Sequence, residues 1–444
     1  MKLKILTGLL TGLVVFASTT ALFCQPSRAG NNNFFCGTLP YISTGILNPE
    51  PVFNERILIN TSVRLLASAQ VDVGVKVSSA SVATAPKAED FFIQGNDKYE
   101  KGDYQGALAA YSQAIVLNPN YVEAYNRRGI ARRALGDNKS ALADFNEALR
   151  INPNYHTGYY NRGVVRSDLG DKQGAVADYN EALRINPNNA AAYLNRGTTR
   201  SQLGDKQGAV ADFSEALRVN PNFAFAYLGR GNTRSSLGDK QGAVADFSEV
   251  LRIDPNNADA YYNRGNARYD LGDNQGALAD FSEALRINPN DAGFYYNRGI
   301  VRSDLGDKQG AVADYNEALR INPNHAQAYN NRGNTRRSLG SNQDAIADFE
   351  RALQINPKLF QAYYNRGLAR RSLGDKQGAI ADYSEALRID PNFAAAYQNR
   401  GVARRDSGDK PGAIQDFQKA ADLYQQQGDK DSYEKAINIL RRLQ

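Results

Sequence analysis

The chain has 444 residues, with 25 tyrosines, a single methionine and no tryptophan. Such a skewed composition is typical of one short segment copied many times, and it favours an extended repeat array over two or three ordinary domains. The formal net charge of +6 falls to +3 beyond the first 29 residues, where 50 basic residues face 47 acidic ones. This balance does not indicate the clustered basic face of a nucleic-acid-binding protein.

Residues 1–29 have the composition of an export signal. Two lysines lie in the first four residues, residues 5–23 are apolar and uncharged, and Ala29 ends a motif with small residues at the cleavage positions. We therefore predict a protein exported to the periplasm or outside the cell. Two alternatives stay open. The uncleaved segment is nearly long enough to anchor the chain in a membrane, and Cys24 is a lipoprotein acceptor in principle, although the bulky Phe23 precedes it.

Residues 30–87 differ from the rest of the chain and are expected to form a leader and linker that is partly disordered. Valines alternate with other residues from Val71 to Val77, a pattern that predicts one short strand. A run rich in Ser, Ala and Thr follows at 78–88. If the signal is removed with Cys24, then Cys36 is the only cysteine left, and an intramolecular disulfide is not expected.

From residue 88 onward, the sequence repeats with a period of 34 residues. One glycine series runs from Gly95 to Gly401, and a second, from Gly102 to Gly408, follows it seven residues later without interruption. Nine prolines recur in the same step. A constant period of this length predicts a solenoid, here of ten units over residues 88–427.

Each unit is predicted to contain two helices. In the third unit, 156–189, the first helix is expected from about 157 to 169, where Gly170 ends it. Asp171 then caps a second helix that extends to about residue 185. A single hairpin cannot bury its apolar stripe, whereas stacked neighbours bury one another's stripes, so the units are expected to form a continuous row.

The last segment, 428–444, is predicted to be a C-terminal capping helix. Its apolar residues follow helical spacing and are expected to face the last unit: Tyr433, Ala436, Ile437, Leu440 and Leu443. The fold class is therefore all-α.

The repeat resembles the tetratricopeptide repeat. Counting positions within each unit, that pattern has an aromatic at four, Gly at eight, Ala at twenty, an aromatic at twenty-four, Ala at twenty-seven and Pro at thirty-two. In the third unit these are Tyr159, Gly163, Ala175, Tyr179, Ala182 and Pro187. The resemblance covers most of the chain. The repeats are similar to those of exported bacterial proteins of this family, including cyanobacterial ones. It implies an α-α superhelix of about ten helix-turn-helix repeats that binds other proteins or peptides.

No pattern in the sequence indicates catalysis, a cofactor or a metal site. The two histidines, His156 and His325, lie near the starts of first helices five units apart and are expected to be exposed residues of the cap region. Neither histidine has cysteines at metal-binding spacing. We therefore predict that the protein is not an enzyme and takes no small-molecule substrate.

The first helices carry the candidate binding residues. Position six is asparagine in seven units: Asn161, Asn195, Asn263, Asn297, Asn331, Asn365 and Asn399. An amide has a donor and an acceptor, so this asparagine ladder would match the main chain of an extended partner, as the resemblance to tetratricopeptide superhelices that hold substrate main chain implies. The alternative is that these asparagines are merely solvated. Gly229 interrupts the ladder, and asparagine at that position is expected to tighten binding.

Tyrosines at position five flank the ladder: Tyr160, Tyr262, Tyr296 and Tyr364. Either they add contact area for a partner or they pack against adjacent first helices. We expect Tyr295, at position four, to be the buried aromatic and Tyr296 to be the less costly one to truncate. We also expect the ladder positions to face solvent, so that replacing four of them with alanine leaves the fold intact.

Arginines and an aspartate recur together in units two to ten. Arginine occupies positions seven and eleven, and aspartate occupies position twenty-three of the second helix. The preferred interpretation is that these charges pair inside the wall of the solenoid, and a basic groove for an acidic partner is the alternative. The known carboxylate clamp for chaperone tails needs charged residues where this chain has Tyr296 and Ile300, or Asn330 and Asn334, so that mode is not expected.

Together these features predict a peptide-binding scaffold that holds extended polypeptide segments along the first helices. Two other hypotheses remain: a structural envelope protein that associates with itself, and a non-catalytic accessory subunit of an envelope enzyme complex. The expected partners are other proteins or peptides, and the only expected membrane contact is through an uncleaved signal.

Overall fold

The computed structural model describes residues 22–26, 34–38 and 85–443, in two units that are considered separately. In the first unit, strands β1 (Leu22–Pro26) and β2 (Phe34–Thr38) form an antiparallel pair whose register places Cys24 opposite Cys36. The strand predicted at Val71 to Val77 lies outside the described residues, as does most of the predicted signal.

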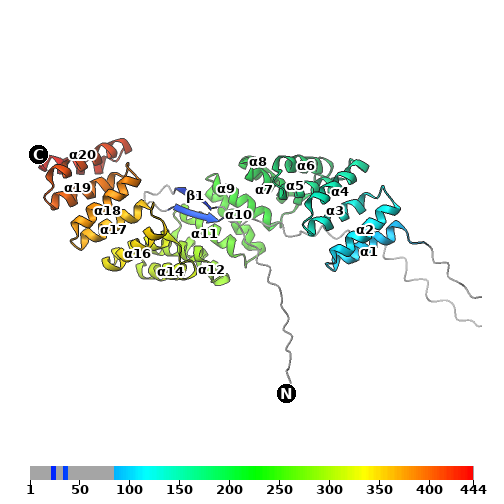
Figure 1. Cartoon of the computed structure of the whole chain (residues 1–444), viewed down its shortest axis with the longest axis horizontal. Helices are drawn as coiled ribbons and strands as arrows, with labels where there is room; N and C mark the ends of the chain where they lie inside the picture. The colour runs from blue at the N-terminus through cyan, green and yellow to red at the C-terminus, as the bar shows by residue number, and fades with distance from the viewer. Residues whose placement is uncertain (1–21, 27–33, 39–84, 444) are drawn as a thin grey trace, which may run out of the picture. The chain divides into compact units, whose positions relative to one another are not determined.

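The second part of the described structure, residues 85–443, contains all the repeat units and consists of helices in consecutive antiparallel pairs (Figure 1). Their bounds are α1 Ala88–Glu100, α2 Tyr104–Leu117, α3 Val122–Ala134, α4 Asn138–Ile151, α5 His156–Asp168, α6 Lys172–Ile185, α7 Ala190–Gln202, α8 Lys206–Val219, α9 Ala224–Ser236, α10 Lys240–Ile253, α11 Ala258–Asp270, α12 Asn274–Ile287, α13 Ala292–Asp304, α14 Lys308–Ile321, α15 Ala326–Ser338, α16 Asn342–Ile355, α17 Phe360–Ser372, α18 Lys376–Ile389, α19 Ala394–Asp406, α20 Lys410–Gln427 and α21 Lys430–Leu443. The all-α solenoid of ten helical pairs with one further helix is confirmed.

The boundaries of the pairs follow from their polar and glycine residues. In the third unit Gly170 has φ of 86°, a left-handed conformation that lets the chain leave α5. The Asp171 carboxylate then accepts a hydrogen bond from the Gly174 amide at 2.9 Å and caps α6. Glycine at position eight has a packing role, because a Cβ atom on Gly163 would lie 2.8 Å from the Tyr179 ring.

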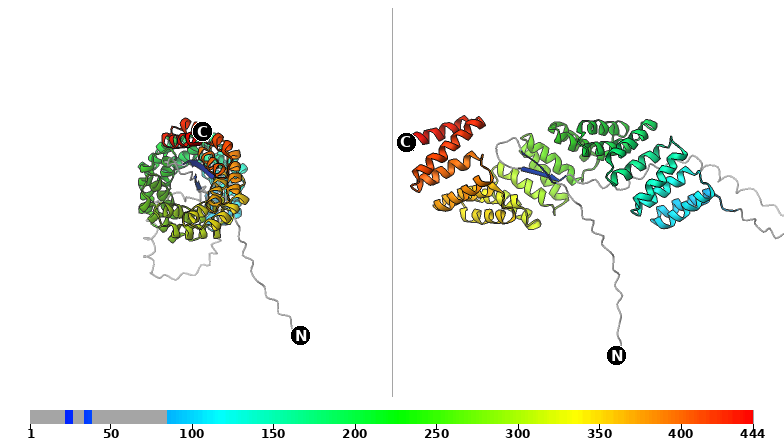
Figure 2. Two further views of the ribbon diagram at one scale, coloured as in Figure 1. Left: turned by 90° about the vertical axis from the view of Figure 1, so that its left-hand side faces the viewer. Right: turned by 45° about the horizontal axis from the view of Figure 1, so that its top comes forward.

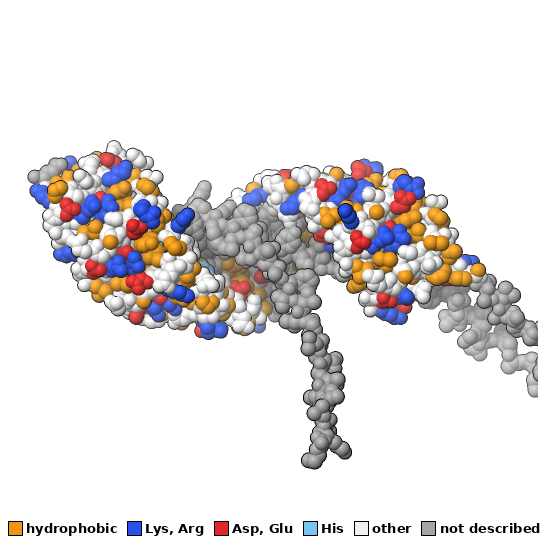
Figure 3. Space-filling model, viewed as in Figure 1, with side chains coloured by type: hydrophobic (Ala, Val, Ile, Leu, Met, Phe, Trp, Pro, Cys, Tyr) orange, Lys and Arg blue, Asp and Glu red, His pale blue; other side chains and the backbone are white. Residues whose placement is uncertain are grey.

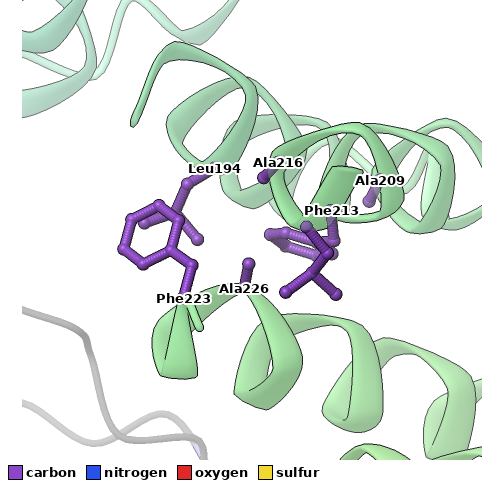
Figure 4. Close-up of a cluster of buried hydrophobic side chains, with 7 residues drawn as sticks. Leu194, Ala209, Phe213, Ala216, Phe223 and Ala226 are labelled. Carbon is purple, nitrogen blue, oxygen red and sulfur yellow. The ribbon is translucent and has the colours of Figure 1, made fainter. Parts of the chain in front are cut away.

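The core runs between units as well as within them. Figure 4 shows one such cluster, in which Leu194 of α7 and Phe213 of α8 meet Phe223, the residue before α9, and Ala226 of α9 in the next unit. Because each unit lends apolar surface to its neighbour, no hairpin has a complete core of its own.

The residue at position five is buried more deeply in the core than the tyrosine at position four, which packs at its edge. Tyr296 is 5% exposed, whereas Tyr295 is half-buried beneath the Arg298 guanidinium, 5.6 Å from its ring centre. The expectation that Tyr295 is the better buried of the two is therefore wrong. Compared with the predicted orientation, helix α13 is rotated about its axis, so that its position-five side chain contacts the start of the next first helix.

The C-terminal end of the array is covered as predicted. Gly428, with φ of 75°, ends α20, and α21 then packs Leu440 against Phe417 of the tenth unit. Within the described residues, no helix is both long and apolar enough to cross a membrane.

Candidate peptide-binding surface on the first helices

The first helices of successive units lie against one another along the array. Helix α3 contacts α5, α7 contacts α9 and α15 contacts α17, and the second helices of residues 85–443 make no comparable contacts with each other. A stack that is crowded on one side curves toward that side, so the first helices line the concave surface. Figure 2 shows the helical pairs end-on, arranged around an axis.

The ladder asparagines connect each first helix to the one before it. In six units the Nδ2 group donates a hydrogen bond to position five of the preceding unit, 35 residues earlier. The pairs are Asn161 with Asn126 Oδ1 (2.8 Å), Asn195 with Tyr160 Oη (3.1 Å), Asn297 with Tyr262 Oη (2.9 Å), Asn331 with Tyr296 Oη (3.1 Å), Asn365 with Asn330 Oδ1 (3.0 Å) and Asn399 with Tyr364 Oη (3.0 Å). The expectation that the whole amide is free for a partner is thus corrected for these six, because the donor is used within the wall.

Two positions depart from this pattern because position five of the preceding unit is leucine, which cannot accept a hydrogen bond. Asn263 follows a unit with Leu228 at position five, and its amide makes no hydrogen bond within the described residues. Gly229 follows Leu194 and packs on Phe213, whose ring would lie 2.8 Å from an added Cβ atom. Asparagine at position 229 would therefore meet a buried ring and find no hydroxyl or amide oxygen on Leu194, so it would not form the ladder bond seen in the six units, and tighter binding at this position stays a prediction.

Burial divides the ladder. Asn297 is 3% exposed and donates a second hydrogen bond to Asn266 Oδ1 at 2.9 Å. The expectation that the ladder faces solvent is wrong for this residue, whereas the other six asparagines are half-buried.

The position-five tyrosines are packing residues. Tyr262 lies 4.8 Å from Phe294, and Tyr296 lies 6.1 Å from Tyr315, between ring centres. Burial raises the pKa of Tyr262 to about 12. Tyr160 and Tyr364 are half-buried and pack on position-24 tyrosines in the same way. Packing against the next first helix is seen for Tyr262, whose ring meets Phe294 of α13, whereas the rings of Tyr160 and Tyr364 pack on the second helix of their own unit. A role of these tyrosines in binding a partner stays a prediction.

Each buried aspartate at position twenty-three is held by two arginines. Arg162 Nη2 lies 2.6 Å from Asp178 Oδ1, and Arg166 Nη1 lies 2.9 Å from Asp178 Oδ2. The same triad recurs at Asp144, Asp212, Asp246, Asp280, Asp314, Asp348, Asp382 and Asp416. The predicted pairing inside the wall is confirmed, and these eighteen arginines are not a free basic lining. Over the face in Figure 3, basic and acidic side chains of the repeat unit are interspersed.

The histidines are less exposed than expected. His325 Nδ1 accepts a hydrogen bond from the Ala328 amide at 3.3 Å, and its ring lies 4.6 Å from that of Tyr296. Burial lowers the pKa of His325 and also that of the half-buried His156. Within the described residues, no three His, Cys, Asp or Glu side chains are grouped so as to hold a metal ion.

A row of helical hairpins whose units bury one another's cores defines a helical-repeat protein. Models described as "TPR repeat" match residues 95–132, 166–204, 231–272, 265–306 and 333–374, and models described as "Tetratricopeptide repeat" match 122–155, 190–223, 292–325, 314–347 and 360–393. The chain belongs to the tetratricopeptide repeat family.

Several solved structures are similar to parts of the chain. The MamA protein is 27% identical over 39% of this chain and 94% of its own, with a TM-score of 0.36. YrrB, described as a TPR protein with an unusual peptide-binding site, is 25% identical over 41% of this chain and 95% of its own (TM-score 0.38). A tetratricopeptide repeat protein from Parabacteroides merdae is 25% identical over 56% of this chain and 98% of its own (TM-score 0.41). No curated protein sequence matches the chain.

Proposed function

We propose that this protein is a non-catalytic, exported interaction scaffold whose concave first-helix surface binds an extended polypeptide segment. The observation that carries the proposal is the orientation of the ladder amides. In Asn161, Asn195 and Asn365 the donor is fixed to the preceding unit, and the Oδ1 atom has no partner within the described residues.

Three fixed acceptors, two of them in adjacent units, suit the main chain of a partner. An extended polypeptide presents N–H groups at regular intervals, and each hydrogen bond that it donates contributes about 0.5–1.5 kcal/mol net. Because the side chains are already ordered by their bonds to the wall, less conformational entropy is lost on binding than for free asparagines. Recognition of this kind depends little on the partner's side chains, and this favours a scaffold with many clients.

Paired charges argue for a polypeptide over nucleic acid as the partner. A nucleic-acid surface needs unpaired Lys and Arg aligned with phosphates. Here the arginines of positions seven and eleven are paired with the position-23 aspartates in units two to ten, two arginines to each aspartate, and are not free to align with phosphates.

Export is the part of the proposal that rests on the sequence of residues 1–29. N-terminal sequencing of protein from its native host tests it, with Gly30 as the expected first residue. A mature chain that begins at Met1 would contradict cleavage and favour the membrane-anchored alternative.

Photo-crosslinking from the concave surface tests the binding proposal. A photoreactive amino acid at Asn263 removes no internal hydrogen bond, because this amide has none within the described residues. The matched control carries the same group at the exposed Gln275, on second helix α12 of the same unit. We expect the Asn263 variant, and not the control, to trap extended segments of other proteins in cells.

The other outcomes of that experiment contradict the proposal in distinguishable ways. Trapping of a second copy of the chain would favour self-association. Trapping of one enzyme from either position would favour an accessory subunit.

A further inference from the structure

Two places on the first-helix surface show how adjacent units share a carboxylate. Arg133 at position twelve of the second unit donates through Nε to Asp168 Oδ2 at position thirteen of the third unit, at 2.8 Å. In the sixth and seventh units Tyr269 donates its hydroxyl to Asp304 in the same way. In each pair the aspartate lies close enough to the position-24 tyrosine of its own unit to contribute to that residue's raised pKa, after the larger effect of burial.

The equivalent place between units eight and nine lacks the carboxylate. Position twelve is Arg337, but position thirteen is Ser372, whose hydroxyl donates to the Leu368 carbonyl of its own helix at 3.0 Å. The position-24 residue here is Tyr383, which is fully buried.

Two donors at this place are left unsatisfied. Arg337 Nε and Tyr383 Oη are both buried, and neither has a hydrogen-bond partner within residues 85–443. In the second and third units, the corresponding Nε is the atom that donates to the Asp168 carboxylate. A carboxylate at the position of the missing aspartate would therefore meet an arginine donor that has no other partner.

A second guanidinium lies beside the same tyrosines. Arg371, at position twelve of the ninth unit, donates to Asn399 Oδ1 at 2.9 Å and forms no ion pair with a described carboxylate. Its charge and that of Arg337 both act on Tyr364 and Tyr383, opposing the rise in pKa that burial produces. Helices α15 and α17, which carry the two arginines, contain no Asp or Glu, whereas α11 contains two and α13 one.

We infer that Arg337, Arg371 and Tyr383 form a carboxylate-binding site on the concave surface, which takes an acidic side chain or the C-terminal carboxylate of the bound polypeptide. The planar guanidinium fork matches a carboxylate, and charge-assisted hydrogen bonds to it are stronger than neutral ones. The identity of the ligand as a polypeptide rests on the proposed function. The capacity to bind a carboxylate rests only on the local geometry.

The site is tested with small probes on the full chain labelled with 15N-arginine. The probes are N-acetyl-aspartate methylamide for an acidic side chain, N-acetylglycine for a chain terminus, and N-acetyl-asparagine methylamide as the uncharged control. The Arg337 Nε–H resonance is assigned from its loss in Arg337→Lys. We expect this resonance to shift with one or both carboxylates and not with the asparagine probe, and the tighter of the two identifies the source.

Two matched variants exchange the chemistry of the two places. Ser372→Asp supplies the carboxylate from within the chain and should weaken binding of the probe at Arg337 by about tenfold or more, as expected for the loss of a charge-assisted contact. Asp168→Ser removes the native carboxylate beside Arg133 and should make the Arg133 Nε–H resonance respond to the same probe.

An Arg337 resonance that ignores both carboxylates, or that responds equally in Ser372→Asp, would overturn the inference. So would an Arg133 resonance that stays silent in Asp168→Ser while the circular dichroism spectrum is native. These probes need no protein partner, so a failure of crosslinking at Asn263 and a failure of the carboxylate site are separate results.

Discussion

Replacement of Asn297 with alanine should destabilise the array, whereas the same replacement at Asn263 should not. Asn297 is 3% exposed and donates to both Tyr262 Oη and Asn266 Oδ1 at 2.9 Å. Two hydrogen bonds at about 1 kcal/mol each, together with a partner left buried and unsatisfied, predict a loss of about 2–3 kcal/mol. Asn263 is half-buried and makes no hydrogen bond within the described residues, and alanine is the better helix former, so its change should stay within about 0.5 kcal/mol.

Native-state hydrogen exchange read by mass spectrometry is the appropriate assay, because a long repeat array does not unfold as a single two-state unit. The exchange free energy of amides in α11 and α13 should fall in Asn297→Ala and remain unchanged in Asn263→Ala. Equal losses in the two variants would refute the assignment of the ladder donors to the wall. Such a result would also remove the reason for expecting ordered hydrogen-bond acceptors on the concave surface.

Three further predictions concern the wall. Tyr296→Ala should lower the free energy of unfolding by about 3–5 kcal/mol, as for a buried aromatic, and Tyr295→Ala, at a half-buried position, by clearly less. If hydrogen exchange in α13 is accelerated more by Tyr295→Ala than by Tyr296→Ala, the helix is wrongly phased. Asp314→Ala leaves two arginines without their carboxylate and should cost about 3–5 kcal/mol, whereas Glu317→Ala, which breaks an exposed pair, should cost less than about 1 kcal/mol, as judged by thermal melts. Because burial lowers the folded-state pKa of His325, its contribution to stability is complete above about pH 6.5, the unfolded value, and is lost as the pH falls below it. His325→Asn keeps a capping side chain of the kind found at two other units and should remove that part of the pH dependence from melts between pH 7.5 and 5; an unchanged pH profile would contradict the assignment.

The repeat period and the turn residues were sufficient to predict the helices and their stacking. Glycine at position fifteen and the residue after it, an aspartate cap in nine of the ten units, fix where each pair turns, and these are local properties of the backbone. The arginine–aspartate triads were also predictable, because the two arginines and the aspartate occur together in nine units, whereas the first unit has none of the three residues and carries Gln94, Lys98 and Ala110 instead.

The phase of the first helix and the bonds of the ladder were not predictable from one unit. Tyr295 and Tyr296 are both aromatic and adjacent, and the choice between them depends on contact with the next unit. The ladder bonds join residues 35 apart and so cross a unit boundary. One signal was present in the sequence. Gly229 is the only glycine at position six, and the residue 35 positions before it, Leu194, has no hydroxyl or amide group to accept a ladder hydrogen bond.

The central claim is that the first-helix surface recognises the main chain of its partner. The most direct measurement takes a segment trapped from Asn263, synthesises it, and determines its affinity by calorimetry in two scans. In one scan each backbone N–H is replaced by N-methyl, and in the other each side chain is truncated to alanine. We expect N-methylation at spaced positions to weaken binding by about 2–10-fold each, as the loss of single hydrogen bonds requires. Most alanine substitutions, apart from that of a carboxylate bound at the Arg337 site, should have little effect. Binding that tolerates every N-methyl group but depends on a few apolar side chains would contradict this claim.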